Sequence, residues 1–318
     1  MASGRTITDT AALERAEAIL RSYGGGRVSR DSPLAPLTTF RVGGPAALFL
    51  EVESEADLAA AGRAVRETSL LAVVLGKGSN VLVSDGGFPG LVLRLGKAYR
   101  WSKREGNELH AGGAMPLPAL AGVALRHSLA GLEFGVAIPA TLGGSVRMNA
   151  GAHGRSMDEV VDSIDVFLLD SGERRAIGAT DAGFVYRRSS LPPNGVVVGA
   201  SLALTPGQPD AIRARMDEAR DWRRATQPLA EPNCGSVFKN PPGGHAASLI
   251  ESIGGKGVSV GGATVSPKHA NFIVTAPGAR SADVVELIRR LQQMVADRHG
   301  VRLEPEVHLV GPFDITPF

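Results

Sequence analysis

The chain has 318 residues, 43% of them hydrophobic and 21% charged, which is typical of a globular protein large enough for two or three domains. Lys and Arg total 34 against 32 Asp and Glu, so the net charge of +2 gives no reason to expect nucleic acid as a partner. A single cysteine excludes an internal disulfide, the N-terminus lacks a signal-peptide pattern, and the longest uncharged stretch, residues 191–209, contains four prolines. We therefore expect a soluble, cytoplasmic protein that does not bind membranes.

The first half of the chain alternates short helices with short apolar strands. Helical spacing ends at a run of three glycines, and Ser54 with Asp57 predicts a capping box at the start of the next helix. The predicted elements, in chain order, are a helix at 10–23, a strand at 46–52, a helix from 55 to about 66, strands at 71–75 and 91–95, and a helix at 116–127.

Near Gly207, after a segment rich in turn residues, the sequence changes from apolar strands to a charged helix. The predicted elements in the second half of the chain are a hairpin over 160–177 that turns at 170–172, a buried strand at 196–204, helices at 210–226 and 246–253, a strand at 271–275, a helix at 281–299 and a strand at 301–310. This change in sequence character predicts a domain boundary near residue 207.

A glycine-rich turn, GKGSN, directly follows a predicted buried strand. The glycines let the backbone approach a ligand, and consecutive N–H groups in such a turn suit a pyrophosphate. The turn matches neither the dinucleotide fingerprint nor the P-loop, because Lys77 is followed by glycine. A plain turn between two strands is the alternative.

A second glycine-rich segment runs from residue 138 to 154 and carries few side chains that can pack. This pattern suggests backbone pressed against a flat cofactor. The alternative, an irregular surface loop, is disfavoured because the segment also holds apolar residues that need burial.

Other chemically capable residues carry weak signals when taken singly. Arg187 could bind a carboxylate or an enolate, and Glu304 and Glu306 share one face of the last predicted strand, yet taken alone the pattern favours solvent exposure for all three. The histidines show no metal-ligand spacing, so no metal is expected. Cys234 lacks the surroundings of a nucleophile and is expected to be a small buried side chain.

Seven segments, in order and over nearly the whole chain, resemble the UDP-N-acetylenolpyruvoylglucosamine reductases, the MurB family of cell-wall precursor enzymes. They are TTFRVGGPA, LGKGSNVLVSDGGFPG, GLEFGVAIPATLGGSVRMNAGAHG, VYRRSS, NCGSVFKNP, SPKHANFIV and LEPEVHLVG. The resemblance implies an α+β flavoprotein of the shorter family type, without an extra substrate-covering loop. Residues 1–207 would form a two-subdomain FAD-binding fold of the vanillyl-alcohol-oxidase/PCMH type, divided near residue 97, and residues 208–318 a UDP-sugar-binding domain.

The reaction implied by the resemblance reduces UDP-N-acetylglucosamine enolpyruvate to UDP-N-acetylmuramate, a peptidoglycan precursor, with NADPH and FAD. Hydride passes from NADPH to the flavin, and then from flavin N5 to the enolpyruvyl methylene carbon. The enolate charge that develops must be stabilised, and the neighbouring carbon protonated. The family motifs place Arg187 and Glu306 at the substrate carboxylate as stabilising groups and make Ser236 the proton donor, whereas Glu304 has no such role.

The resemblance also implies the binding residues. Expected flavin contacts are Gly76, Lys77, Gly78, Ser79, Asn80, Pro139, Ala140, Thr141, Gly143, Gly144, Asn149 and Gly151. Expected substrate contacts are Tyr186, Lys239, Asn240 and His269, with Lys268 as a further candidate. The expected partners are the enolpyruvyl sugar nucleotide and NADPH, and we expect a monomer.

The chain departs from the family pattern at Ala140, Ser145 and His153, and none of these residues has a proposed catalytic role. Two other functions stay open on the sequence. One is an FAD-dependent alcohol or lactone oxidase of the same fold, and the other is a nucleotide-sugar binder without catalysis, which the joint presence of Arg187, Ser236 and Glu306 disfavours.

Overall fold

The structure, a computed structural model, describes residues 10–313, which form two compact units. Unit 1 comprises residues 10–30, 47–77 and 90–222, and unit 2 comprises residues 31–46, 78–89 and 223–313. The domain boundary at residue 207 stays a prediction. The two compact units do not divide the chain at residue 207, because unit 2 also contains the early segments 31–46 and 78–89. The expectation that the N-terminus has no signal peptide rests partly on residues 1–9, which lie outside the described range.

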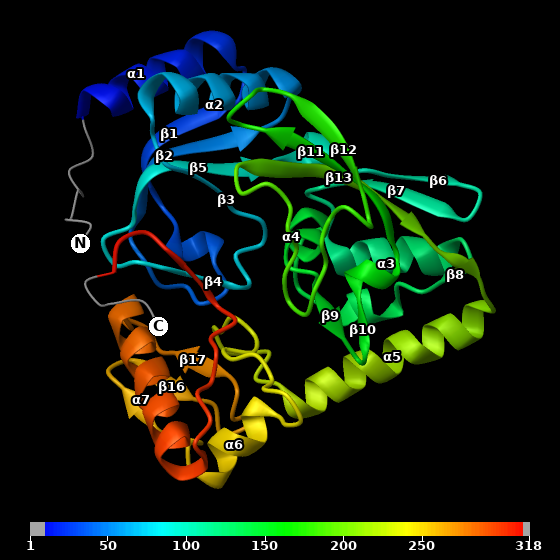
Figure 1. The fold of residues 1–318 in the computed structure, drawn as a ribbon, viewed down its shortest axis with the longest axis vertical. Helices are drawn as coiled ribbons and strands as arrows, with labels where there is room; N and C mark the ends of the chain where they lie inside the picture. The colour runs from blue at the N-terminus through cyan, green and yellow to red at the C-terminus, as the bar shows by residue number, and fades with distance from the viewer. Residues whose placement is uncertain (1–9, 314–318) are drawn as a thin grey trace. The chain divides into compact units, whose positions relative to one another are not determined.

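Helices and strands alternate along the chain (Figure 1). The helices are α1 Thr10–Tyr23, α2 Glu55–Thr68, α3 Leu117–Arg126, α4 Leu142–Arg147, α5 Pro209–Thr226, α6 Ala246–Ser252 and α7 Ser281–His299. The strands are β1 Arg27–Pro33, β2 Pro45–Val52, β3 Ala72–Val74, β4 Val81–Val83, β5 Phe88–Leu95, β6 Ser102–Glu105, β7 Glu108–Gly112, β8 Leu129–Ala130, β9 Gly151–Ala152, β10 Arg155–Ser156, β11 Val161–Leu168, β12 Arg174–Gly178, β13 Gly195–Ala203, β14 Thr205–Pro206, β15 Ser259–Val260, β16 Ala263–Val265, β17 Ile273–Thr275 and β18 His308–Val310.

Most of the elements predicted from periodicity are confirmed. Helices α1 and α7 have the predicted bounds, and the Ser54 hydroxyl accepts a hydrogen bond from the Asp57 amide at the start of α2, at 3.2 Å. The predicted hairpin is the antiparallel pair β11 and β12. The predicted strand at 301–310 is wrong over 301–307: regular pairing begins at His308, and Pro305 forms only an isolated bridge. The glycine-rich segment contains a helix, α4, that its composition did not predict.

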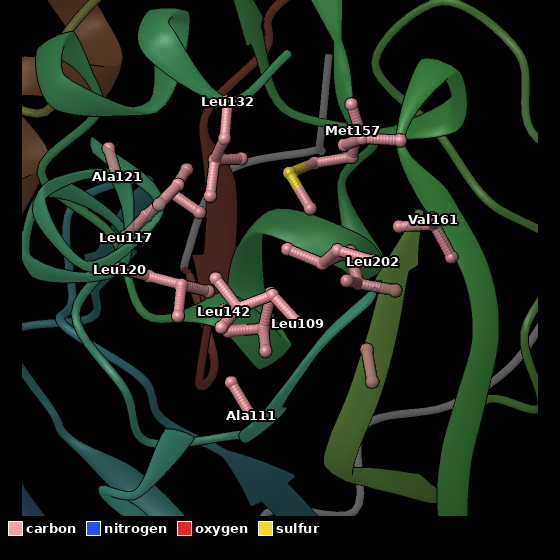
Figure 2. Close-up of a cluster of buried hydrophobic side chains, with 14 of the residues drawn as sticks. Leu109, Ala111, Leu117, Leu120, Ala121, Leu132, Leu142, Met157, Val161 and Leu202 are labelled. Atoms are coloured by element: carbon pink, nitrogen blue, oxygen red, sulfur yellow. The ribbon is translucent and has the colours of Figure 1, made fainter. Parts of the chain in front are cut away.

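Unit 1 is built around a five-stranded sheet with the order β12-β11-β13-β7-β6. Strand β13 is buried along almost its whole length because both faces of the sheet are covered. Val196 and Val198 pack with side chains of α1 and α2, whereas Val197 and Leu202 face the core under α3 and α4. Figure 2 shows this second core, where Leu142 of α4 lies among the leucines of α3 and β7. The core thus fixes α4, from which the glycine-rich segment continues.

Unit 2 packs α7 against a three-stranded sheet with the order β15-β16-β17, beside which α7 lies in Figure 1. Strand β18 pairs in parallel with β4, so residues near the end of the chain lie beside residues that follow the GKGSN turn. Phe40 and Leu82, from the two early segments, are buried in the same core as the apolar face of α7. These long-range contacts explain why the early segments belong to this unit.

Candidate active site

Arg187 lies at the tip of a tight turn in unit 1. Val185 and Arg188 close the turn by exchanging backbone hydrogen bonds of 3.0 and 3.1 Å. Arg187 has a φ of +58°, a left-handed conformation that costs an L-residue roughly 1 to 2 kcal/mol. Its guanidinium donates to the Gly151 carbonyl at 2.8 Å and lies over the ring of Tyr186, which is exposed. The turn therefore holds a cation in one position beside an accessible aromatic ring.

Asn149 ties the Arg187 turn to the glycine-rich segment. Its side chain is buried, with Nδ2 donating to the Val185 carbonyl at 3.1 Å and Oδ1 accepting from the Asp158 amide at 3.0 Å. The sequence predicts Asn149 as a flavin contact. In the structure, both ends of its amide bind the protein's own backbone.

The two glycine-rich segments meet within unit 1. Thr141 caps α4, accepting from the Gly144 amide at 3.3 Å, and a Cβ atom added to Gly76 would lie 2.7 Å from the Thr141 hydroxyl. A Cβ atom on Gly143 would lie 3.0 Å from the Val197 carbonyl oxygen, so this glycine allows α4 to pack closely on the sheet. The other predicted flavin residues of unit 1 are Lys77 and Pro139, which are exposed, and Ala140, which is half-buried.

The rest of the GKGSN turn belongs to unit 2. Gly78 has a φ of +67°, and its carbonyl accepts from the Thr39 amide at 3.0 Å. Ser79 is half-buried. Asn80, also half-buried, donates through Nδ2 to the Glu306 carbonyl at 3.1 Å. A residue predicted to bind flavin thus contacts the backbone of a residue predicted to be catalytic.

Ser236 lies in a segment of unit 2 that Asn271 holds in place. The buried Asn271 accepts from the Phe238 amide at 2.9 Å through Oδ1 and donates to the Phe238 carbonyl at 2.8 Å through Nδ2. Its backbone carbonyl accepts from the Val237 amide at 2.9 Å. Sequence reasoning missed this role of Asn271, although the residue lies within the SPKHANFIV segment.

Glu306 lies beside the Ser236 segment. Its amide donates to the Val237 carbonyl at 2.7 Å, and Phe238 bridges to Pro305 in antiparallel fashion. Ser236 directly precedes Val237, and Glu306 directly follows Pro305. These backbone contacts therefore place the segments of the half-buried Ser236 and Glu306 side by side. These two groups are predicted to act on adjoining atoms of one substrate.

Lys239 and Asn240 follow Ser236 and already have protein partners. Lys239 Nζ lies 2.5 Å from the carboxylate of Glu304, which is largely exposed. Asn240 Oδ1 accepts from the Ala246 amide at 3.1 Å at the start of α6, so the side chain organises the loop before that helix. Glu304 thus forms an ion pair with Lys239, and the distinction between Glu304 and Glu306 stays a prediction.

His269 is half-buried in unit 2. Its Nδ1 accepts from the Asn271 amide at 3.2 Å, and its ring packs edge-on against Phe272. Burial, together with the positive charge of Lys256, lowers the pKa of His269 and favours the neutral ring. The neighbouring Lys268 is exposed and donates to the Arg224 carbonyl at 2.5 Å.

Cys234 is buried, as predicted. Burial, aided by the negative charge of Glu306, raises the pKa of the thiol far above its ordinary value. A neutral, enclosed thiol is a poor nucleophile, which agrees with the expectation that Cys234 is a small buried side chain.

Unit 1 thus gathers Arg187 with Tyr186, Asn149 and Gly151, whereas unit 2 gathers Ser236 with Glu306 and Asn80. Within residues 10–313, no cluster of histidine, cysteine or acidic side chains is arranged to hold a metal ion. No helix in that range is long and apolar enough to span a bilayer.

Comparisons with known proteins identify two domains in this chain. Residues 46–178 match the family described as FAD binding domain, and residues 227–310 match the C-terminal domain of UDP-N-acetylenolpyruvoylglucosamine reductase. A protein of that name from Heliobacterium modesticaldum is 43% identical over 288 residues, covering 90% of this chain and 91% of the relative. UDP-N-acetylenolpyruvoylglucosamine reductase 2 from Symbiobacterium thermophilum is 44% identical over 299 residues, covering 94% and 96%.

Among solved structures, the crystal structure of the Thermus caldophilus UDP-N-acetylenolpyruvylglucosamine reductase is similar, with a TM-score of 0.80 at 37% identity. The match covers 90% of this chain and 99% of that chain. The likeness therefore spans both units.

Proposed function

This chain belongs to the family of UDP-N-acetylenolpyruvoylglucosamine reductases, and from that membership we propose that it reduces UDP-N-acetylglucosamine enolpyruvate to UDP-N-acetylmuramate with NADPH. It is an oxidoreductase whose FAD-binding domain covers residues 46–178 and whose C-terminal domain covers 227–310. The α+β fold with an FAD-binding domain followed by the C-terminal domain of this family, expected from the sequence, is confirmed. The product is a peptidoglycan precursor, and the reaction takes place in the cytoplasm.

FAD fits the glycine-rich segments of unit 1. The contact between Gly76 and Thr141 brings together two stretches that carry few side chains, which leaves backbone that a flat cofactor can approach. Gly76, Lys77, Thr141, Gly143 and Gly144 would hold the cofactor there, with Pro139, Ala140 and Gly151 as further contacts. When bound, FAD accepts hydride from NADPH and supplies it to the substrate.

The observation that supports the mechanism is the backbone hydrogen bond from Glu306 to Val237, which sets the Glu306 segment beside the Ser236 segment. Ser236 would protonate the carbon next to the carboxylate, and Glu306, in protonated form or as a hydrogen-bond partner, would stabilise that carboxylate as its charge grows. Arg187, held by its Gly151 contact, supplies a fixed positive charge for the same enolate. Tyr186, Lys239, Asn240 and His269 would contact the sugar nucleotide.

An anaerobic absorbance experiment tests the proposal. The purified protein should be yellow, NADPH should bleach the flavin band, and UDP-N-acetylglucosamine enolpyruvate should restore it without oxygen. A colourless protein that takes up no FAD would refute the proposal. Rapid reoxidation by oxygen with no response to the sugar nucleotide would indicate an alcohol or lactone oxidase. Sugar-nucleotide binding without NADPH oxidation would indicate a binder.

A further inference from the structure

We infer that Asn149 is a positioning residue for Arg187, an inference that rests on the proposed function. Residues 147–151, which are the last residue of α4 and the four residues after it, form a strap along the loop that carries the Arg187 turn. Asn149 lies in the middle of this strap and binds the first residue of the turn, Val185. Arg187 itself binds Gly151, two residues further along the strap.

The strap holds the far end of the same loop as well. The Arg147 carbonyl accepts from the Ser189 hydroxyl at 2.7 Å, and the Arg147 guanidinium donates to the carbonyls of Leu191 at 3.1 Å and Pro192 at 2.9 Å. The loop is therefore attached to the strap before, at and after Arg187. Of these attachments, the Asn149 amide is the one at the base of the turn.

The conformation of Asn149 fits this role. Its φ of +41° lies in the left-handed region, which asparagine tolerates better than most residues with a side chain. The buried amide has its donor on Val185 and its acceptor on Asp158, so rotating it would break both bonds. Without the Val185 contact, the base of the turn loses its attachment to the strap, while Arg187 still contacts Gly151 and Ser189 still contacts Arg147.

The strap is also continuous with α4, whose first residues are proposed to hold the flavin. Arg187 would therefore keep a fixed distance from the flavin, because the strap and the turn both belong to unit 1. A misplacement of about 1 Å at such a site can cost about 100-fold in rate. We expect loss of the Asn149 donor to slow transfer to the sugar nucleotide far more than flavin reduction.

The experiment uses Asn149→Asp, which keeps the acceptor for the Asp158 amide and removes the donor to Val185. Asn149→Gly, which relaxes the positive φ and removes both bonds, serves if the first variant folds poorly. Ser190→Ala is the matched control, since the exposed Ser190 donates to the Gly183 carbonyl at 3.3 Å in the same loop and not to the strap. Stopped-flow absorbance measures flavin reduction by NADPH and anaerobic reoxidation by UDP-N-acetylglucosamine enolpyruvate, each per bound flavin.

The expected result for Asn149→Asp is a reoxidation rate reduced by about 10- to 100-fold relative to the NADPH step, with Ser190→Ala close to wild type. Combined with Arg187→Ala, it should add almost no further loss, because the positioned group is already absent. Equal slowing of both half-reactions, or losses that multiply in the double variant, would overturn the inference. If Arg187→Ala alone leaves reoxidation fast, the proposed role of Arg187 fails instead.

Discussion

The side-chain amide of Asn80 donates to the carbonyl oxygen of Glu306 at 3.1 Å, which joins residues 226 positions apart. The Glu306 amide donates in turn to the Val237 carbonyl at 2.7 Å. Because the backbone of Glu306 is held on both sides, a change confined to its side chain should leave the surrounding segment in place. Glu306 is therefore well suited to an isosteric substitution.

Glu306→Gln should slow reoxidation of the reduced flavin by the enolpyruvyl sugar nucleotide by about 100-fold or more, and should leave reduction by NADPH nearly intact. The amide matches the carboxyl group in shape but is a much weaker hydrogen-bond donor to the substrate carboxylate than a carboxylic acid. Stopped-flow measurement of the two half-reactions separates these effects.

Glu304→Gln is the control for that substitution. Glu304 pairs with Lys239 at the surface, and exposed ion pairs contribute at most about 1 kcal/mol, so kcat should not change. The KM for the sugar nucleotide should fall by a few-fold at most, because Lys239 no longer has to leave Glu304. A loss of kcat equal to that of Glu306→Gln would contradict the distinct role of Glu306.

Ser236→Ala should reduce reoxidation by the sugar nucleotide by about 100- to 10,000-fold, the range typical of a lost general acid, while flavin reduction by NADPH stays close to wild type. Transient kinetics with each substrate gives both rates. Cys234→Ala, two residues away, should turn over normally. A comparable loss of reoxidation in that variant would indicate a role for the thiol and contradict the assignment to Ser236.

The buried thiol of Cys234 predicts a pH dependence of stability. Its pKa is raised in the folded state, so above about pH 8.5 the unfolded chain loses a proton that the folded chain keeps. The contribution of this thiol to stability is therefore full below that pH and declines above it, by up to about 1.4 kcal/mol per pH unit. Urea unfolding between pH 7 and 10 should show a steeper decline in wild type than in Cys234→Ala, and parallel curves would disprove this.

Gly78→Ala should destabilise the protein far more than Gly257→Ala. Both glycines of unit 2 have positive φ, +67° and +79°, so the conformational penalty is similar. A Cβ atom at Gly78 would lie 2.7 Å from Thr38 Cα and closer still to the Leu37 carbonyl oxygen, whereas Gly257 has open space.

Urea denaturation of both alanine variants measures this difference. Gly257→Ala should cost about 1 kcal/mol, and Gly78→Ala several kcal/mol, since backbone atoms cannot move aside as a side chain can. Equal costs would show that the turn adjusts to the extra methyl group.

Local sequence pattern was sufficient for the elements with a clear apolar face. Helix α7 was predicted to its end residues because its apolar residues recur with helical spacing and Gly300 ends it with a φ of +66°. The segment 301–307 misled the same reasoning, since alternation suggests a strand but Pro305 lacks the amide that a regular ladder needs. Pairing of β4 with β18 was not predictable, because its partners are far apart in sequence.

The candidate catalytic residues were predicted from motifs, and the groups that hold them were not. Asn149 and Asn271 act on backbone atoms of distant residues, Val185 and Phe238. A sequence does not display such contacts, because every residue offers the same carbonyl oxygen. The scaffold of the site therefore became visible only with the fold.

The core of unit 2 contains Phe40 and Leu82 together with residues of α6 and α7. During synthesis, the two early side chains leave the ribosome roughly 10 to 40 s before α7 does, at common elongation rates. Until then they lack their native partners in α7, and their apolar surface is accessible to chaperones or to other nascent chains. Unit 2 can complete its core only after α7 has been made, and a fragment beginning at residue 223 would lack part of its own interior.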